Sequence, residues 1–193
     1  TFGKFFEKLV YQRLNCACGH LISDSQGGGR ARNGALQQII RVIEEVQTRV
    51  FYSDCVDSPN NAVVLALLDV SKAFDKFNRH VLIKKLIDLG VCDKLLQIVI
   101  SFYHDRRQRV SVDKEYSKTV TTCNGGPQGS VITLFCWLVY INDLATEAGS
   151  ALFVDDVSLW LSSPDIPGVI SKLNHELTRI YNWSVSNSVI FDF

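Results

Sequence analysis

Apolar segments that end in carboxylates constrain the fold of this chain more than any other feature. Residues 62–68 form a continuous apolar run of Ala, Val and Leu, which is typical of a strand buried on both faces. The run stops at Asp69. Further along, apolar runs flank Asp155 and Asp156, a pattern that predicts a tight β-hairpin with both carboxylates at its tip. Unpaired carboxylates are costly to bury, so these acids must be solvated, paired or bound to a cation.

The remaining periodicity predicts helices interspersed with strands. Apolar residues recur at helical spacing over residues 34–51, 79–89, 94–104, 130–144 and 165–186. A second hairpin is expected from strands at 109–112 and 119–123, and a last strand from 189–193. The fold class is therefore α+β, with a mixed or antiparallel sheet packed on helices.

Composition narrows the class of protein further. The 193 residues are 47% hydrophobic and contain 20 basic and 20 acidic side chains, as in a packed domain or a piece of one. The charges are segregated, because residues 1–110 hold 16 basic and 11 acidic side chains (+5) and residues 111–193 hold 4 and 9 (−5). The longest strongly apolar run, 131–141, is shorter than the roughly 20 residues that cross a membrane, so no membrane association is expected.

Two further features concern the chain's origin. Its six cysteines form no C-x-x-C pair, and Cys92 and Cys136 lie in apolar sequence typical of reduced core thiols, which favours an intracellular compartment. Methionine is absent, even at position 1, which suggests a piece of a longer reading frame.

The chemistry of the three acids depends on whether their strands are neighbours. If they are, Asp69, Asp155 and Asp156 converge, and a few carboxylates together with water and phosphate oxygens suit Mg²⁺. Two such ions can activate a 3′-hydroxyl and stabilise a leaving pyrophosphate. The alternative is that Asp155 and Asp156 form an ordinary turn and that Asp69 caps a helix.

The residues around these acids resemble the motifs of one family, the reverse transcriptases of non-LTR (LINE-type) retrotransposons. Five collinear segments carry the resemblance: 67–76 (L-L-D-V-S-K-A-F-D-K), 107–110 (R-Q-R-V), 125–131 (G-G-P-Q-G-S-V), 140–144 (Y-I-N-D-L) and 153–156 (F-V-D-D). Leu173, Asn174, Trp183 and Asn187 resemble the helix that follows in the family. Collinear matches over most of a chain are far more specific than any single motif.

The resemblance implies a polymerase-like palm with partial fingers and with the thumb absent. Residues 1–193 would be a reverse transcriptase domain fragment, with about 1–61 part of the fingers and about 62–193 mainly palm. The implied activity is RNA-directed DNA polymerisation by two-metal nucleotidyl transfer. An RNA template, a DNA primer and dNTPs would be the partners, two Mg²⁺ ions (or Mn²⁺) the cofactors, and the nucleus or cytoplasm the location.

The resemblance also assigns roles to individual residues. Asp69 and Asp155 would be the principal metal ligands, with Asp156 a further acid and the Val70 carbonyl a metal contact.

Five residues, Val70 among them, would contact the incoming nucleotide. Phe74 would exclude a ribose 2′-hydroxyl, although it could equally be an ordinary core aromatic. Gln128 and Gly129 would line the pocket for nucleotide and template, where glycine permits close approach of the backbone. Arg30 would bind the triphosphate with its bidentate guanidinium, and a flexible Gly-Arg loop is the alternative.

Some positions depart from the family pattern. Ile132, Thr133 and Leu134 replace the usual L-G-P, and the family's lysine is not found among residues 187–193. We therefore expect the fragment to be weakly active or inactive alone.

Two alternative functions remain: a degenerate, non-catalytic remnant that binds nucleic acid, or a metal-dependent phosphodiesterase or nuclease. The candidates for phosphate contacts, each of which could also lie on a solvated face, are Lys72, Lys76, Arg79, Lys84, Lys85, Arg106, Arg107 and Arg109.

Overall fold

The chain forms two compact units, each built from two separate stretches of sequence. The computed structural model describes residues 2–30, 34–51, 62–144 and 148–192. We call the first unit, Thr1–Leu21 with Lys72–Tyr140, the helical unit, and the second, Ile22–Ser71 with Ile141–Phe193, the sheet unit. The expected division into fingers and palm near residue 61 stays a prediction.

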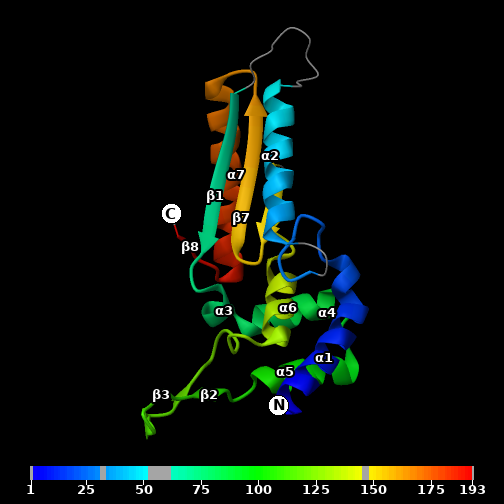
Figure 1. The fold of residues 1–193 in the computed structure, drawn as a ribbon, viewed down its shortest axis with the longest axis vertical. Coiled ribbons are helices and arrows are strands. Elements are labelled where there is room, and N and C mark those ends of the chain that lie inside the picture. The colour runs from blue at the N-terminus through cyan, green and yellow to red at the C-terminus, as the bar shows by residue number, and fades with distance from the viewer. Residues whose placement is uncertain (1, 31–33, 52–61, 145–147, 193) are drawn as a thin grey trace. The chain divides into compact units, whose positions relative to one another are not determined.

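The sheet unit is a four-stranded antiparallel sheet with a helix on each face (Figure 1). Its elements are α2 (Ala35–Phe51), β1 (Ala62–Val70), β6 (Gly149–Phe153), β7 (Asp156–Ser163), α7 (Ile166–Asn187) and β8 (Phe191–Asp192). The strand order is β6-β7-β1-β8, and all neighbours are antiparallel. The predicted α+β class, with an antiparallel sheet packed on helices, is confirmed.

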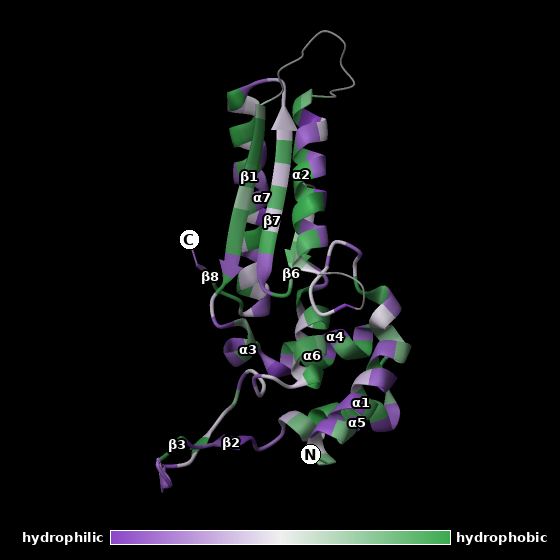
Figure 2. Ribbon diagram, viewed as in Figure 1, coloured by the Kyte–Doolittle hydropathy of each residue, from purple (hydrophilic) through white to green (hydrophobic). Residues whose placement is uncertain are grey.

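Strand β1 is covered unequally on its two faces. Leu68 and Val70 are buried, whereas Leu65 and Leu67 on the alternate face are 44% and 71% exposed. Helix α2 lies over that second face but leaves an apolar groove of about 510 Å³ beside Leu65 and Leu67. The prediction of a strand buried on both faces is therefore wrong. Figure 2 shows that β1 is hydrophobic along most of its length and ends in a hydrophilic tip.

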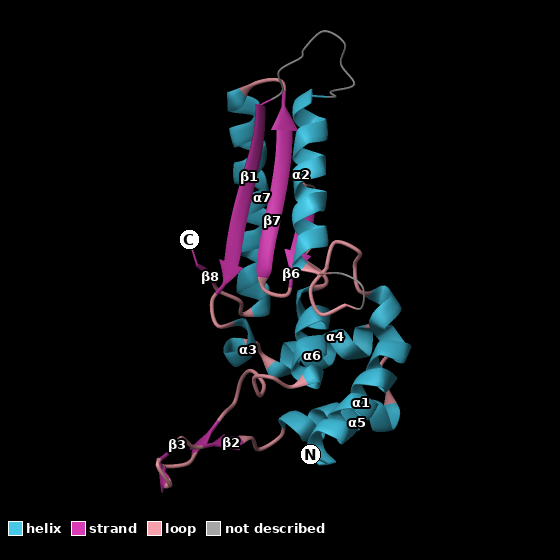
Figure 3. Cartoon of the chain, viewed as in Figure 1, coloured by secondary structure: helices cyan, strands magenta, loops and turns pink. Residues whose placement is uncertain are grey.

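The helical unit contains most of the short elements (Figure 3). They are α1 (Phe2–Cys18), the 3₁₀-helix η1 (Gly19–Leu21), α3 (Ala73–Lys76), α4 (Arg79–Asp88), α5 (Asp93–Tyr103), β2 (Arg107–Gln108), β3 (Ser111–Val112), β4 (Glu115–Tyr116), β5 (Val120–Thr121) and α6 (Val131–Ile141), whose last residue opens the second stretch of the sheet unit. Each helix expected from periodicity is present, with ends that differ by a few residues from the prediction.

An aromatic cluster forms the core of the helical unit. Trp137 stacks on Tyr140 with ring centroids 5.6 Å apart, and both rings pack against Phe77. Phe77 also meets the edge of Tyr103 at 5.8 Å. Because buried aromatic side chains remove large apolar areas from water, this cluster fixes α3, α4 and α5 around α6.

A second hairpin is present, as predicted, but its pairing differs: residues 111–112 pair with 115–116, and residues 120–121 pair with 107–108 instead of with 109–112. Strand β2 pairs with β5, and β3 pairs with β4 around Asp113 and Lys114. Both turn residues have positive φ, as the type I′ turn of a two-residue hairpin requires. The two paired ladders are exposed throughout.

The cysteine prediction holds for one thiol and fails for the other. Cys136 is buried in α6, whereas Cys92 is exposed at the start of α5. Within the described ranges, no helix is both long enough and apolar enough to cross a membrane.

Candidate active site

The three predicted acids meet at one end of the sheet unit. The ladder between β1 and β7 ends with the pair Leu68 and Val157, so that Asp69 and Asp156 follow on the two neighbouring strands. Asp155 immediately precedes β7, in the turn that joins it to β6. The prediction that Asp69 and the Asp155–Asp156 hairpin belong to adjacent strands is confirmed, whereas their sharing of one cation stays a prediction.

The hairpin differs from the prediction in one residue. The pair Phe153 and Asp156 closes the β6–β7 ladder, so the turn consists of Val154 and Asp155, and Asp156 belongs to the strand. Val154 has a φ of 62°, a backbone conformation that costs a β-branched residue on the order of 1–3 kcal/mol. Such strain persists only where the surroundings hold the backbone in place.

The electrostatics of the turn show that the acids interact. Partial burial raises the pKa of Asp155, and the negative charges of Asp156 and Asp69 raise this pKa further, while a backbone hydrogen bond opposes the shift. A cation placed among the three carboxylates would relieve this repulsion.

These carboxylates suit a hard divalent cation by their chemistry. In the part of the chain that the structure describes, no group of three or more His, Cys, Asp or Glu side chains is already arranged as a metal cage. Mg²⁺ does not need such a cage, because it usually takes one or two carboxylates together with waters and substrate phosphates. Asp69 and Asp155, with Asp156 beside them, are therefore the residues that could hold it.

A fourth carboxylate, which sequence reasoning missed, lies beside Asp69. In the register of β1 with β8, Asp69 is paired with Asp192, and Val70 with Phe191. Paired residues of antiparallel strands point to the same face, so Asp69 and Asp192 share one face. A strand was expected at 189–193, but its partner could not be read from the sequence. The side chain of Val70 is buried and has no ligand atom, so this residue could offer a metal only its backbone carbonyl.

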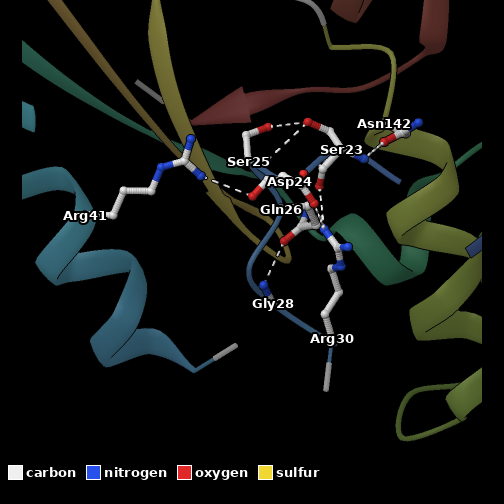
Figure 4. A network of polar contacts seen from close by, with 8 residues as sticks. All are labelled: Ser23, Asp24, Ser25, Gln26, Gly28, Arg30, Arg41 and Asn142. Carbon is white, nitrogen blue, oxygen red and sulfur yellow. Dashed lines mark hydrogen bonds and ion pairs between the residues drawn. The ribbon is translucent and has the colours of Figure 1, made fainter. Parts of the chain in front are cut away.

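A buried glutamine, Gln26, holds the turn that carries Asp155. Figure 4 shows the polar network of which Gln26 is part, with its bond to Gly28. Gln26 is 2% exposed, and its Oε1 accepts hydrogen bonds from the backbone N–H groups of Gly28 (2.9 Å) and Val154 (3.0 Å). The backbone around Gln26 also pairs with β6, since Gly27 donates to Leu152 at 2.8 Å and Leu152 to Ser25 at 2.8 Å. The loop is thus joined to the β6–β7 hairpin by backbone and side-chain hydrogen bonds.

The same polar network includes the predicted phosphate ligand Arg30. Its Nη1 donates to the Ser23 carbonyl (2.9 Å) and to the Asp24 carboxylate (3.2 Å). Asn142, from the Y-I-N-D-L segment, accepts a 2.7 Å hydrogen bond from the Ser23 amide. Arg30 therefore sits in a hydrogen-bonded loop of the sheet unit, in the same unit as the three acids.

The other predicted nucleotide contacts lie in the helical unit and surround one cavity. Phe74, Gln128 and Gly129 all line a space of about 500 Å³. Phe74 is partly exposed and tilts against Trp137 at 6.2 Å. The amide nitrogen of Gln128 donates to the Asp75 carboxylate at 3.2 Å, and the Gly129 carbonyl accepts from the Lys4 ammonium at 2.6 Å. These three residues, expected to act together, are brought together within this unit.

The chain resembles known proteins both in sequence and in structure. A family profile described as reverse transcriptase (RNA-dependent DNA polymerase) matches residues 1–190. The chain is 28% identical over 197 residues to the RNA-directed DNA polymerase from mobile element jockey of Drosophila melanogaster, and 26% identical over 195 residues to a probable RNA-directed DNA polymerase from transposon BS of that species. Each alignment covers 95% of this chain but only 20% and 21% of the relative, so the chain spans about a fifth of the length of these curated relatives.

Solved structures share the fold. A telomerase from Candida albicans, in complex with a TWJ fragment of telomeric RNA, is 14% identical with a TM-score of 0.65, over 96% of this chain and 33% of that one. An apo telomerase from Candida tropicalis is 12% identical with a TM-score of 0.52, over 90% of this chain and 35% of that one. At this identity the likeness concerns the fold alone, and it confirms the predicted polymerase-like fold. Because the family profile spans nearly the whole chain and the transposon polymerases align along it, the chain belongs to the reverse transcriptase family of RNA-directed DNA polymerases.

Proposed function

We propose that the chain carries the polymerase site of a non-LTR retrotransposon and adds deoxynucleotides to a DNA primer paired with an RNA template. The observation that carries this proposal is the convergence of Asp69, Asp155 and Asp156 at one end of an antiparallel sheet. Divalent metal ions are general to the family. Burial and, to a smaller extent, the negative charges of Asp156 and Asp69 raise the pKa of Asp155, which supports a cation among these acids.

The acids would hold the ions that this reaction needs. Asp69 and Asp155 are the ligands of two Mg²⁺ ions, or of Mn²⁺, with Asp156 and the Val70 carbonyl as further contacts. When bound, such ions activate the primer 3′-hydroxyl and stabilise the charge on the attacking and leaving oxygens. The antiparallel ladder and the Gln26 contacts fix the carboxylates before substrate arrives, so that little reorganisation is needed.

The nucleotide contacts have separate roles. Phe74 packs under the sugar and excludes a ribose 2′-hydroxyl, while Gln128 and Gly129 form the wall for base and sugar; all three line one cavity. Arg30 binds the triphosphate, because its Nε and Nη2 donate no hydrogen bond to any described residue and remain for phosphate oxygens.

Primer extension tests the proposal. An oligo(dT) primer on poly(rA) is incubated with dTTP and Mg²⁺ and with either the chain itself or the chain fused to the thumb of a family member. We expect weak or no extension by the chain alone, because the thumb of the family holds the primer so that its 3′-hydroxyl lies in line with the nucleotide. Such orientation contributes on the order of 7–11 kcal/mol to catalysis. The fusion should extend the primer modestly.

Two variants make the result specific to the proposed site. Asp155→Asn should lower extension by the fusion more than about a hundredfold, as expected when a group that acts on the transition-state charge is removed. Asp88→Asn, an exposed acid on α4, is the matched control and should extend normally. Extension that survives Asp155→Asn would contradict the site, a silent fusion that binds RNA would favour a non-catalytic remnant, and primer shortening would favour a nuclease.

A further inference from the structure

Arg79, at the first position of α4, donates all five of its N–H groups to the protein. Nε bonds the Gly125 carbonyl at 2.8 Å, and Nη1 bonds the carbonyls of Tyr103 (2.8 Å) and Thr122 (2.7 Å). Nη2 bonds the Thr122 hydroxyl (3.1 Å) and the Asn124 carbonyl (3.0 Å). Because a guanidinium has five N–H donors, none is left for a nucleic-acid phosphate in this structure.

Four of the five acceptors belong to residues 122–125, which lead into the nucleotide cavity. We call residues 124–129 the glycine loop. Arg79 bonds two of its first residues directly, and it also bonds Thr122 just before the loop and Tyr103 at the end of α5. One side chain thus joins the end of α5 to the start of the glycine loop.

The loop is also bonded to α3 and to the residue that directly follows this helix. The N–H of Gly125 donates to the Phe77 carbonyl at 2.9 Å, and the N–H of Gly126 donates to the Phe74 carbonyl at 2.8 Å. Gly125 is buried with a φ of +63°, and a Cβ there would collide with the backbone of Asp75. The glycine allows this close approach, and Arg79 satisfies the carbonyls that the approach takes out of water.

The charge of Arg79 makes this arrangement unusual. No described carboxylate forms an ion pair with it, and all its partners are neutral oxygens. Burial lowers the pKa of Arg79, which shows that its positive charge is partly removed from water. A charge in such surroundings persists only when hydrogen bonds compensate it fully, and five of them do so here.

We infer that Arg79 is a positioning residue for the nucleotide site: it fixes the start of the glycine loop, so that Gln128 and Gly129 keep their places on the cavity wall. The inference rests on the proposed function of that cavity. Arg79 acts through the loop and not through contact with a nucleotide or a nucleic acid.

The substitution Arg79→Lys separates this role from that of a phosphate ligand. Lysine keeps the positive charge but has one nitrogen with three donors, so it can replace at most three of the five hydrogen bonds of Arg79. If Arg79 were a phosphate ligand, lysine would largely replace it. If Arg79 positions the loop, lysine fails. The matched control is Arg13→Lys, an exposed position on α1 of the same unit.

Two measurements on the full chain test the inference. The first is hydrogen exchange at the Gly125 and Gly126 amides, which should become faster in Arg79→Lys. The second is the affinity for a fluorescent dATP analogue with Mg²⁺, which should fall by about tenfold, or about 1.4 kcal/mol, while binding of a 20-nucleotide RNA stays unchanged. A merely structural defect would lower both affinities.

A milder variant keeps the test informative if Arg79→Lys folds poorly. Thr122→Val removes one acceptor and should weaken nucleotide binding by a smaller factor in the same direction. Equal nucleotide affinity of the unaltered chain and a folded Arg79→Lys or Thr122→Val variant would overturn the inference. Failure of the unaltered chain itself to bind the nucleotide would instead contradict the proposed function.

Discussion

The side-chain oxygen of Gln26 accepts a 3.0 Å hydrogen bond from the backbone N–H of Val154, the residue that precedes Asp155. The two residues are 128 positions apart in the sequence. Val154 has a positive φ, a backbone conformation that is unfavourable for a β-branched residue. The hydrogen bond to Gln26 therefore holds the turn at its most strained residue. The position of Asp155 therefore depends on a residue outside the hairpin that carries it.

Removing this contact should destabilise the sheet unit. In Gln26→Ala, the N–H groups of Gly28 and Val154 lose their acceptor, and a buried donor left without a partner costs about 1–3 kcal/mol. We expect the free energy of unfolding, measured in urea, to fall by at least that amount. Gln47→Ala, on the exposed side of α2, is the control and should change it by less than about 0.5 kcal/mol. Equal stability of the two variants would show that the Gln26 contact is not formed in solution.

Much of the site could be predicted because its signals are local. The apolar run before Asp69 and the apolar runs around Asp155 have the length and composition of strands, and acids at strand ends are conspicuous. The one error in the hairpin has a physical cause. Asp is a common turn residue, whereas a β-branched residue rarely adopts positive φ, so the sequence favours a turn at Asp155 and Asp156 over the observed turn at Val154 and Asp155.

What could not be predicted depends on partners distant in the sequence. The pairing of Asp69 with Asp192 is set by where β8 docks, and the five hydrogen bonds of Arg79 join three separate segments. Helix α1 escaped prediction for another reason. Large apolar side chains such as Phe5 and Leu9 are exposed, and only Val10, Leu14 and Cys18 mark its buried face.

Thiol reactivity should follow the environment of each cysteine. Burial raises the pKa of Cys136 to about 12, and burial also raises that of Cys18. The thiolate is the reactive species, so both thiols should resist alkylation by iodoacetamide in the folded chain at pH 8, whereas the exposed Cys16 and Cys123 should react. Peptide mass spectrometry after alkylation identifies the sites. Fast alkylation of Cys136 without denaturant would mean that the core around α6 opens readily.

Cys92 tests whether a neighbouring carboxylate slows the reaction of an exposed thiol. It is exposed, but its hydrogen bond to the Asp93 carboxylate and the negative charge of that carboxylate raise its pKa. We therefore expect it to react more slowly than Cys16 at pH 8, and Asp93→Asn should accelerate it. An unchanged rate in Asp93→Asn would contradict this account of the Cys92 thiol.

The exposed hairpin should contribute to RNA binding through charge. Arg109 lies 3.9 Å from the ring centroid of Tyr116, an arrangement that presents a guanidinium on an aromatic face. If Arg109 contacts a phosphate of single-stranded RNA, Arg109→Gln should make the slope of log affinity against log salt about 0.7 less steep. Fluorescence anisotropy measures the affinity for RNA between 50 and 200 mM salt, a range in which phosphate contacts dominate binding, and so gives this slope. The control Arg13→Gln should leave the slope unchanged, and identical slopes for both variants would remove Arg109 from the interface.

Neutralising Asp155 should raise the stability of the metal-free chain while abolishing its response to metal. The raised pKa of Asp155 means that the folded state binds this proton more tightly than the unfolded state, so the ionised carboxylate lowers stability as the pH rises through that pKa. Asp155→Asn removes both the burial of this charge and its repulsion by Asp156 and Asp69. A repulsion of up to about 1 kcal/mol between partly exposed carboxylates corresponds to a rise in Tm of about 2–4 °C in a chain of this size.

Calorimetry in EDTA at neutral pH measures that rise. In a second scan, added Mg²⁺ should raise the Tm of the unaltered chain and of Asp88→Asn but not that of Asp155→Asn. A lower Tm for Asp155→Asn in EDTA would show that the Asp155 carboxylate stabilises the fold. It would contradict the account in which its burial and its repulsion by Asp69 and Asp156 lower stability.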